Sequence, residues 1–521
     1  MKNAVTNSIG RRIPQKAEGL GRFRPFGGSF ALVDAGEEIP RNAPPMRPEQ
    51  PSRSKVRKSL REAVERSGLQ SGMTVSFHHH LRNGDALLPM VLSELEAMGM
   101  SDLTIAPSSL TGSHDCVAGF MRRGVVSRIF TSGLRGEVGA AVSRGELDIP
   151  VIIRSHGGRA RAIEEGSIDI DVAFLAAPSC DPLGNISGAR GKSGCGSLGY
   201  AQVDAAFARH VIAVTDGMEK YPLPEPVSIR QHQVNSVVAV ESLGDPSKIA
   251  TGSTRITRNP VDLRIARNAF QLILASELLA PGVSFQVGAG GSSLAVASFV
   301  RNHMRTKGVK GSFGLGGVTG YMVQMLEEGL FDCLYDVQSF DASVRDSLAE
   351  NPRHVEIDQS LYANPLNRGC MVHNLDIVVL AALDVDVDFN VNVMTGNDGV
   401  LRGASGGHSD TAAGAALSIV VAPSFRGGVP TVKERVQTVV TPGESVDAIV
   451  TERGICVNPR REDLLKAASK AGLPVMDIAD LKRDVERLTG LPEPLAFDET
   501  RPVALVEYRD GTIIDTVYRV K

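Results

Sequence analysis

Short apolar runs rich in valine and isoleucine alternate with helical stretches along most of the chain. Such runs are TVSF (74–77), IPVIIR (149–154), IDVAFLAA (170–177) and HVIAVTD (210–216). They are nearly continuous in apolar residues, which is typical of parallel strands that are buried on both faces. Strands that alternate with covering helices predict an α/β fold built on open sheets.

The first 54 residues have a different pattern. Prolines at positions 14, 25, 40, 44, 45, 48 and 51 favour an extended backbone over a helix. We therefore expect residues 1–54 to form an arm, whose apolar section RFRPFGGSFALV packs on the body of the protein or on a partner subunit. Helical periodicity begins after Ser54, with Val56, Leu60, Ala63 and Val64 on one face.

An internal repeat divides the rest of the chain. SGMTVSFHHHLRNG begins at Ser71 and PGVSFQVGAGG at Pro281, and both are expected to form a strand, a polar or glycine-rich loop and a helix. Two further matches, Gly124 with Gly329 and Ala177 with Ala382, occur in the same order at almost the same spacing. The repeat predicts two similar open-sheet domains in tandem, although ordinary strand–loop–helix units also resemble one another.

The predicted boundaries are 55–250 for the first domain and 251–521 for the second domain with its C-terminal extension. In this extension, residues 459–473 and 478–490 have helical patterns. The closing VALVEYRDGTIIDTVYRV is typical of a hairpin, because Asp510-Gly511 supplies the positive φ of a tight turn.

Composition narrows the function classes. The 521 residues carry a net charge of −3 without a long basic tract, which argues against nucleic-acid binding. The six cysteines form no C-x-x-C pair, and the chain begins without an apolar leader, so we expect a reduced compartment, the cytoplasm. The apolar stretches are shorter than the roughly 18–20 residues that a membrane span needs.

Three glycine-rich loops are candidates for binding phosphates or developing oxyanions through backbone N–H groups. They are GAGGSS (288–293), GSFGLGG (311–317) and GASGGHSDTAAGA (403–415). Each alone is more often a structural turn, but together they suggest a site at the carboxyl edge of a sheet. None fits the dinucleotide or P-loop pattern, which disfavours a nicotinamide enzyme or an NTPase.

Histidines follow the first strand of the first repeat. His78 and His80 should share a face because strand side chains alternate. This triplet, His78 to His80, could hydrogen-bond a substrate, bind a metal or simply close the strand, and no third metal ligand is evident. His408, beside Ser409 and Asp410, is too close to them for a Ser-His-Asp triad, and this segment fits a capped helix N-terminus better.

Taken together, the motifs resemble the citrate lyase alpha subunit family of the CoA-transferase superfamily. The resemblance is carried by AEGLGRFRPFGGSF, SFHHHLRNGD, FQVGAGGSSLAVASF, FGLGGVTGYMVQMLEEG, GASGGHSDTAAGA, TPGESVDAIVTERGICVNPRREDL and EYRDGTIIDTVYRV. It implies two CoA-transferase domains of like fold, in agreement with the repeat.

The resemblance also implies an activity. Members of this family exchange acetyl for citryl on the thioester of an acyl-carrier protein, releasing acetate. The expected partners are therefore a beta subunit that cleaves the citryl thioester, an acyl-carrier gamma subunit, citrate and acetate, with a homo-oligomer also expected. No cofactor of its own is expected, because the reacting group is the carrier's CoA-like prosthetic group or, in vitro, acetyl-CoA.

One departure bears on the mechanism. Commoner CoA-transferases carry a nucleophilic glutamate in a Ser-Glu-Asn-Gly motif, whereas this chain has Ser312 and Phe313 where Glu and Asn would stand. The substitution favours direct attack of a citrate carboxylate on the thioester and a mixed anhydride, without a glutamyl intermediate. Such chemistry requires positioning and oxyanion stabilisation from the protein.

The site residues follow from this hypothesis. Catalytic donors are expected among Gly316, Gly317 and His408. Thioester and CoA binding is expected at Gly288, Gly290, Gly291, Gly406 and Gly407, and substrate binding at His78, His79, His80, Arg82, Arg190 and Arg402. No metal is assigned.

Alternatives remain open. A CoA-transferase or acyl-CoA hydrolase for acetate or another short acid would use the same features. Sugar-phosphate isomerases and effector-binding regulators share this architecture, although no helix-turn-helix with a basic face is apparent in the sequence.

Overall fold

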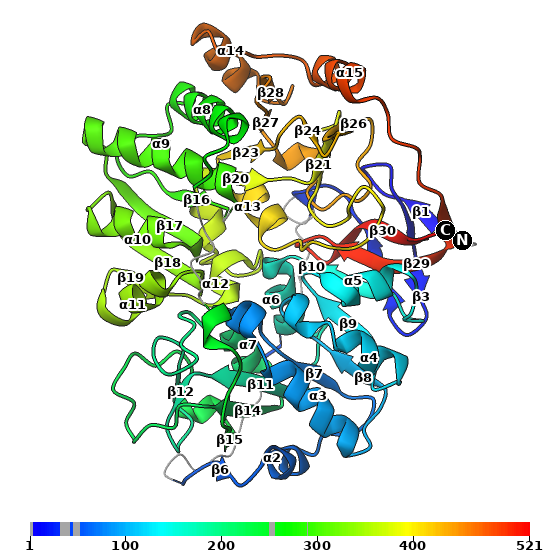
Figure 1. Ribbon diagram of the computed structural model, residues 1–521, viewed down its shortest axis with the longest axis vertical. Helices are drawn as coiled ribbons and strands as arrows, with labels where there is room; N and C mark the ends of the chain where they lie inside the picture. Colours follow the sequence, from blue (N-terminus) through cyan, green and yellow to red (C-terminus); the bar gives the residue numbers. More distant parts are fainter. Residues whose placement is uncertain (1–3, 32–41, 45–52, 250–255, 289) are drawn as a thin grey trace.

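Two large β-sheets, each accompanied by helices, make up the computed structural model, which describes residues 4–31, 42–44, 53–249, 256–288 and 290–521 (Figure 1). Much of the predicted arm, residues 32–41 and 45–52, lies outside the described residues. The alternation of apolar strands and helices therefore gives the mixed α/β fold that the sequence predicts.

The first sheet has eleven strands. In spatial order they are β5 (Arg24–Pro25), β30 (Thr512–Val520), β29 (Phe497–Glu507), β10 (Val151–Arg154), β9 (Val126–Thr131), β8 (Leu103–Ile105), β7 (Thr74–Ser76), β11 (Val172–Ala177), β14 (His210–Thr215), β15 (Ser236–Ala239) and β6 (Val56–Arg57). All six residues of β11 are buried, as expected for a strand covered on both faces.

The second sheet has eight strands. Their order is β19 (His354–Glu356), β18 (Phe331–Ser339), β17 (Gly311–Val318), β16 (Phe285–Val287), β20 (Ile377–Ala381), β23 (Leu417–Val421), β27 (Ala448–Val450) and β28 (Ile455–Val457). All neighbours are parallel except β27 and β28.

The two sheets share one strand order. Seven parallel strands of the first sheet run β10-β9-β8-β7-β11-β14-β15, and seven of the second run β19-β18-β17-β16-β20-β23-β27. Counted along the chain, both read fourth, third, second, first, fifth, sixth, seventh. The shared order brings the carboxyl ends of corresponding strands to corresponding edges of the two sheets.

Helices connect the strands and cover the sheets. Beside the first sheet lie α2 (Leu60–Ser67), α3 (Leu87–Ala97), α4 (Val117–Arg122), α5 (Gly136–Ser143), α6 (His156–Glu164) and α7 (Gly199–Phe207). Beside the second lie α8 (Pro260–Ala275), α9 (Gly291–Lys307), α10 (Gly320–Glu327), α11 (Ala342–Glu350), α12 (Gln359–Ala363), α13 (His408–Gly414), α14 (Glu462–Lys470) and α15 (Ile478–Thr489). Val56, which the periodicity assigned to the first helix, instead lies in β6, because it pairs with Val237.

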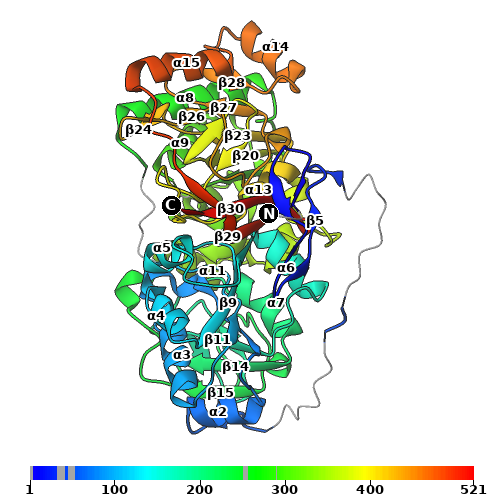
Figure 2. The ribbon, with the colours of Figure 1, turned by 90° about the vertical axis from the view of Figure 1, so that its right-hand side faces the viewer.

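The C-terminal hairpin joins the two ends of the chain. It forms with Gly511 at φ 88°, as the Asp-Gly turn predicts. The sequence assigned it to an extension of the second domain, but β29 pairs in parallel with β10 and so extends the first sheet (Figure 2). The pairing is long-range, and hydrophobic periodicity alone does not indicate a strand's partner.

The described part of the arm packs on this hairpin. Strand β5 pairs with β30, and Phe26 is buried with its ring 4.9 Å from that of Tyr508. The arm was expected to pack either on the body of the protein or on a partner subunit. Residues 24–26 pack on the body of the protein.

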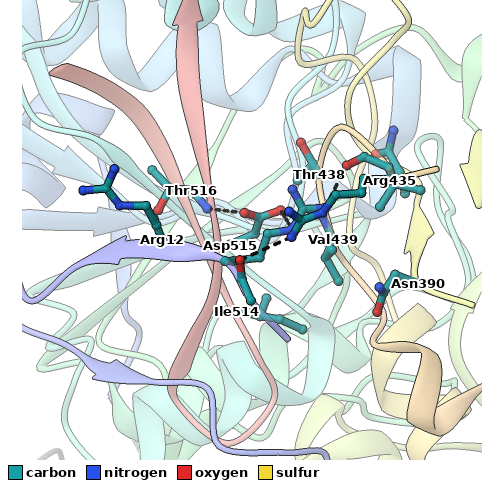
Figure 3. Close-up of polar contacts among 12 residues, drawn as sticks. Arg12, Asn390, Arg435, Thr438, Val439, Ile514, Asp515 and Thr516 are labelled. Atoms are coloured by element: carbon teal, nitrogen blue, oxygen red, sulfur yellow. Dashed lines mark hydrogen bonds and ion pairs between the residues drawn. The ribbon is translucent and has the colours of Figure 1, made fainter. Parts of the chain in front are cut away.

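Asp515 of the hairpin contacts both the N-terminal arm and the loop segment that contains Val439 (Figure 3). Its carboxylate accepts from the backbone N–H groups of Val439, at 2.7 Å, and Thr516, at 2.8 Å, and lies 3.5 Å from the Arg11 guanidinium. Burial raises the pKa of Asp515, and the charge of Arg11 opposes this. Asp515 therefore links the arm, through Arg11, and the loop at Val439 to the C-terminal hairpin.

Two buried carboxylates hold the two sheets together at α6. Asp204 makes two hydrogen bonds of 2.7 Å with Arg159, which also donates to Gln359 of α12. Asp410 of α13 accepts from the Ser155 hydroxyl at 2.8 Å and from the Gly157 amide at 2.9 Å. Because charged groups this deeply buried need fixed partners, these contacts set the position of one sheet edge against the other.

Candidate active site

A cavity of about 580 Å³ lies where the carboxyl ends of both sheets meet. Loops after β7, β8, β9 and β10 form one wall, and β16, β17, β18 and β20 with the segment before α13 form the other. Its lining residues are His79, Arg82, Asn83, Ser109, Thr111, Ser132, Arg135, His156, Tyr200, Gln286, Val287, Gly288, Gly317, Gln338, Phe340, Tyr362, Leu380, Ala381, Val393, Ala404, Ser405, Gly406, Gly407 and His408. Ligands of open α/β sheets bind at this kind of edge.

His79 is the histidine of the predicted triplet that faces the cavity. Its backbone N–H donates to the Ser108 hydroxyl oxygen at 3.0 Å, and its Nδ1 lies 2.6 Å from the same oxygen. Since that oxygen already accepts the amide hydrogen, and no other acceptor for the hydroxyl hydrogen is found among the described residues, Ser108 donates to Nδ1. The ring hydrogen is therefore on Nε2, which has no protein partner among the described residues and is available to a ligand.

The His79 ring is also held neutral. Burial is the main cause that lowers its pKa well below the ordinary value, and the nearby His156 and Arg82 lower it further. Stacking fixes its orientation, because the ring centroids of His79 and Tyr200 are 4.8 Å apart. The arrangement provides a rigid, uncharged N–H donor.

His156 completes a cluster of three rings, with its centroid 4.6 Å from that of Tyr200 and 5.9 Å from that of His79. Its backbone is fixed by a hydrogen bond from its N–H to the Gly406 carbonyl at 2.8 Å, and burial lowers its pKa to about 3. The buried Nδ1 has no hydrogen-bond partner among the described residues. A buried polar atom without a partner is unusual in a native structure and is common where a ligand binds.

His78 and His80 share a face, as predicted, with stacked rings 6.0 Å apart, but this face is turned to the protein interior. His78 Nε2 lies 3.0 Å from Asp204, and His80 Nε2 lies 3.4 Å from the carbonyl oxygen of Ala176. Neither residue lines the cavity. Their predicted contact with substrate is therefore not seen, because the chain turns into a short 3-10 helix (η1, His79–Gly84) directly after His78.

Of the three predicted arginines, the cavity contains Arg82. Its guanidinium lies 4.5 Å from the centre of the Phe340 ring. Arg190 and Arg402 are exposed instead, and each pairs with a surface carboxylate, Glu350 at 3.0 Å and Asp398 respectively. Neither side chain lines the cavity, although Arg402 is only two residues from Ala404, so proximity in sequence to a predicted strand end was an insufficient guide.

The predicted glycines divide into two groups. Gly288, Gly317, Gly406 and Gly407 line the cavity, whereas Gly290, Gly291 and Gly316 do not. Gly290 and Gly291 begin α9, and Gly316 lies against Gln286 with φ 105°.

The lining glycines allow close approaches. A Cβ at Gly407 would lie 2.5 Å from the Tyr362 hydroxyl, and a Cβ at Gly317 would lie 2.2 Å from the Phe340 ring. The N–H groups of Gly406 and Gly407 have no acceptor among the described residues and are free for a ligand.

His408 lines the cavity, but both of its ring nitrogens are engaged. Nε2 donates to the Ala381 carbonyl at 3.1 Å, and Nδ1 lies 2.7 Å from the Thr441 hydroxyl. Burial lowers its pKa to about 4. No nitrogen of His408 is left to contact a substrate. The geometry therefore indicates a structural role for His408 in place of the predicted catalytic one. The Asp410 carboxylate does not cap α13 and accepts instead from the Ser155 hydroxyl and the Gly157 amide at the start of α6.

The lining of the cavity contains no aspartate, glutamate, lysine or cysteine among the described residues. Ser312 and Phe313, at the position of the glutamate in commoner CoA-transferases, do not line it either. Also among the described residues, no group of three or more His, Cys, Asp or Glu side chains is placed to hold a metal ion. The site therefore offers donors, two cations and space, without a side-chain carboxylate or thiol as nucleophile.

Several lining residues were not predicted, namely Arg135, His156, Tyr200, Gln286 and Tyr362. His156 could have been found, because it follows the predicted strand 149–154 after a single serine. Tyr362 could not have been found, because it reaches the cavity from α12, a helix beside the second sheet. Its hydroxyl accepts a hydrogen bond from Gln286 at 2.9 Å.

The chain is similar to known proteins over most of its length. Residues 53–520 match the family described as "Citrate lyase, alpha subunit (CitF)". The chain is 51% identical over 467 residues to the citrate lyase alpha chain of Klebsiella pneumoniae, covering 90% of this chain and 92% of that one.

Solved structures show the same fold. An alpha subunit of citrate lyase from Streptococcus mutans, in complex with citrate, is 48% identical and superposes with a TM-score of 0.95 over 99% of this chain and 100% of that chain. A Pseudomonas malonate decarboxylase hetero-tetramer in complex with malonate shares the fold at 16% identity, with a TM-score of 0.61 over 84% of this chain and 87% of that chain.

Proposed function

Since the chain belongs to the citrate lyase alpha subunit family, a family of CoA-transferase-type enzyme components, we propose that it exchanges acetyl for citryl on a carrier thioester through a mixed anhydride, without a covalent glutamyl intermediate. In the first step a citrate carboxylate oxygen attacks the acetyl carbonyl carbon, the C–S bond breaks, and the carrier thiolate leaves. In the second step the thiolate attacks the citryl carbonyl of the anhydride, the C–O bond breaks, and acetate leaves. Atoms and charge balance without a further reactant.

The observation that carries the proposal is the lining of the cavity: two arginines and neutral hydrogen-bond donors, with no carboxylate or thiol among the described residues. A covalent glutamyl route would require a carboxylate there. A direct route requires that two bound reactants be held in contact, and such positioning can contribute about 7–11 kcal/mol to lowering the barrier.

We assign the oxyanion donors to both walls. The Nε2–H of His79 and the amides of Gly406 and Gly407 all face the cavity without protein acceptors among the described residues. A neutral imidazole suits this role, because it donates without giving up its proton to the leaving thiolate. Loss of one such donor typically costs about 3–4 kcal/mol of transition-state stabilisation.

The proposed partners follow from the same chemistry. The thioester would be delivered by an acyl-carrier subunit that bears a CoA-like group, and a beta subunit would cleave the citryl product. Homo-oligomerisation and a cytoplasmic location are part of this proposal. In the described part of the chain, no helix is long and apolar enough to cross a bilayer.

We also propose that the two sheets represent tandem CoA-transferase domains, with boundaries near residues 55–250 and 251–460. The shared strand order of the two sheets supports this. The closing hairpin would then return to complete the sheet of the first domain.

Acetyl-CoA offered to the full chain tests the function. With citrate present, we expect acetate to be released together with an equal amount of citryl-CoA, and without citrate we expect almost no release. Release of acetate that does not depend on citrate would identify an acyl-CoA hydrolase and contradict the proposal.

A further inference from the structure

Two guanidinium groups face the cavity from the same wall. Arg82 lies in η1 after β7, half-buried, and is stacked on Phe340 at 4.5 Å. Arg135 follows β9, immediately before α5; it is exposed to solvent and lines the cavity. Arg135 was not among the residues predicted from the sequence.

Neither guanidinium has an ion-pair partner within 4.0 Å among the described residues, and no acidic side chain lines the cavity there. The two groups influence each other, since the pKa of Arg82 is lowered first by burial and next by the charge of Arg135. Tyr200 and then Asp341 oppose this effect, and the Asp341 carboxylate also accepts from the Gly320 amide at 2.7 Å. Two like charges beside one hollow are stabilised when an anion lies between them.

The backbone on both sides is fixed. The Arg82 carbonyl accepts from the hydroxyls of Thr111, at 3.4 Å, and Ser113, at 3.2 Å. The turn before Arg135 is tied to the opposite wall, because the Leu134 N–H donates to the Gly403 carbonyl at 3.0 Å. The two cations therefore start from fixed positions, which suits a ligand with two separated anionic groups.

We propose that Arg82 and Arg135 form a two-point subsite that binds the two non-reacting carboxylates of citrate and so selects a polycarboxylate over acetate. This inference rests on the proposed function. The attacking carboxylate must keep its negative charge available, and pairing with a guanidinium would make it a weaker nucleophile. Acetate has one carboxylate, so it cannot bridge the pair and leaves readily after exchange.

The phosphates of the CoA-like group are the other anions that could meet these arginines. They are separated from the thioester by the whole pantetheine chain, whereas both arginines lie close to His79, the proposed donor to the thioester carbonyl. Both arginines line the same cavity as His79, and their charges add to the lowering of its pKa. Citrate is therefore the expected ligand of the two arginines, and the affinity for CoA serves as the comparison.

Calorimetric titration of the full chain with citrate, acetate and CoA tests the pair. We expect Arg135→Gln and Arg82→Gln each to weaken citrate binding about 10- to 100-fold, the usual cost of a lost charge-assisted contact. Arg135→Lys, which keeps the charge but loses the planar fork, should lie between the wild type and Arg135→Gln. Acetate and CoA affinities should change less than about threefold, because neither is expected to touch both groups.

Arg190→Gln and Arg402→Gln are matched controls, since both arginines are exposed and already paired. Citrate affinity that is unchanged in Arg135→Gln, or acetate or CoA affinity that falls equally, would overturn the proposal. If the pair binds citrate but no acetyl–citryl exchange occurs, the proposed function fails and the subsite stands. Exchange that persists with unaltered citrate affinity in both variants rejects the subsite alone.

Discussion

The two walls of the cavity come from sheets with the same strand order, yet they carry different chemistry. The wall from the first sheet supplies ionisable and aromatic groups, namely His79, Arg82, Arg135, His156 and Tyr200. The wall from the second sheet supplies glycines, alanines, amides and a phenol, and its one imidazole, His408, is bound to the protein at both nitrogens.

The difference indicates a division of labour within one repeated scaffold. The first wall can recognise and polarise carboxylates and carbonyls, whereas the second provides close backbone approach and free amides for a chain-like thioester arm. Repetition fixes where strand ends lie, and the loops after those ends decide the chemistry. The predictions below disturb one wall at a time.

The largest effect is expected on the first wall. His79→Ala removes the neutral Nε2–H donor, and we expect kcat to fall about 10²- to 10³-fold, as for other single oxyanion donors. Steady-state exchange assays with acetyl-CoA and citrate measure this. His232→Ala, at an exposed histidine, is the control. Nearly full activity in His79→Ala would contradict the assignment of His79 as an oxyanion donor of the first wall.

On the second wall, Gly317→Ala should interfere sterically. The new Cβ would stand 2.2 Å from the Phe340 ring, which supports Arg82, so the ring and the guanidinium must both shift. We expect kcat/KM for citrate to fall by about tenfold or more, with the fold intact by circular dichroism. Gly112→Ala, where nothing lies within 4 Å, should leave kcat/KM unchanged. An equal fall in kcat/KM in the two variants would contradict a specific role for Gly317 in the second wall.

A smaller effect is expected from Ser108→Ala. The variant removes the hydroxyl that fixes the His79 tautomer, at 2.6 Å from Nδ1, so kcat should fall about fivefold while the citrate KM is kept. In the His79→Ala background the same change should have no further effect, because the two residues act as one unit. Additive losses in the double variant would show that Ser108 acts independently.

The pH profile should show the smallest change. Because burial lowers the pKa of His79 well below 6.5, protonation of this ring occurs only at lower pH. The activity that depends on the neutral ring is therefore fully present at pH 8 and should persist to about pH 6. An inflection in kcat/KM near pH 6.5 that disappears in His79→Gln would contradict a neutral donor.

Periodicity predicted the parallel strands with their covering helices, and the Asp-Gly turn predicted the closing hairpin. They did not predict that β29 pairs with β10, because pairing between distant segments leaves no local signal. For the same reason the sequence could not show that the second region's α12 brings Tyr362 into the cavity.

The site was predicted in part. His78 and His80 share a face as predicted, although His80 lies in η1 and not in a strand, and a pattern of period two does not tell which face is the interior. Gly288, Gly317, Gly406 and Gly407 were located because glycines after strands mark sheet edges. Arg190 and Arg402 do not line the cavity, since both side chains are exposed and pair with Glu350 and Asp398.

The absence of a covalent acyl-enzyme is the central claim of this mechanism, and oxygen transfer tests it most directly. In a single turnover of acetyl-CoA with citrate labelled by ¹⁸O in its carboxylates, the anhydride oxygen comes from citrate. The released acetate should therefore carry one ¹⁸O atom. Unlabelled acetate, with ¹⁸O appearing in an aspartate or glutamate of the protein, would contradict the account.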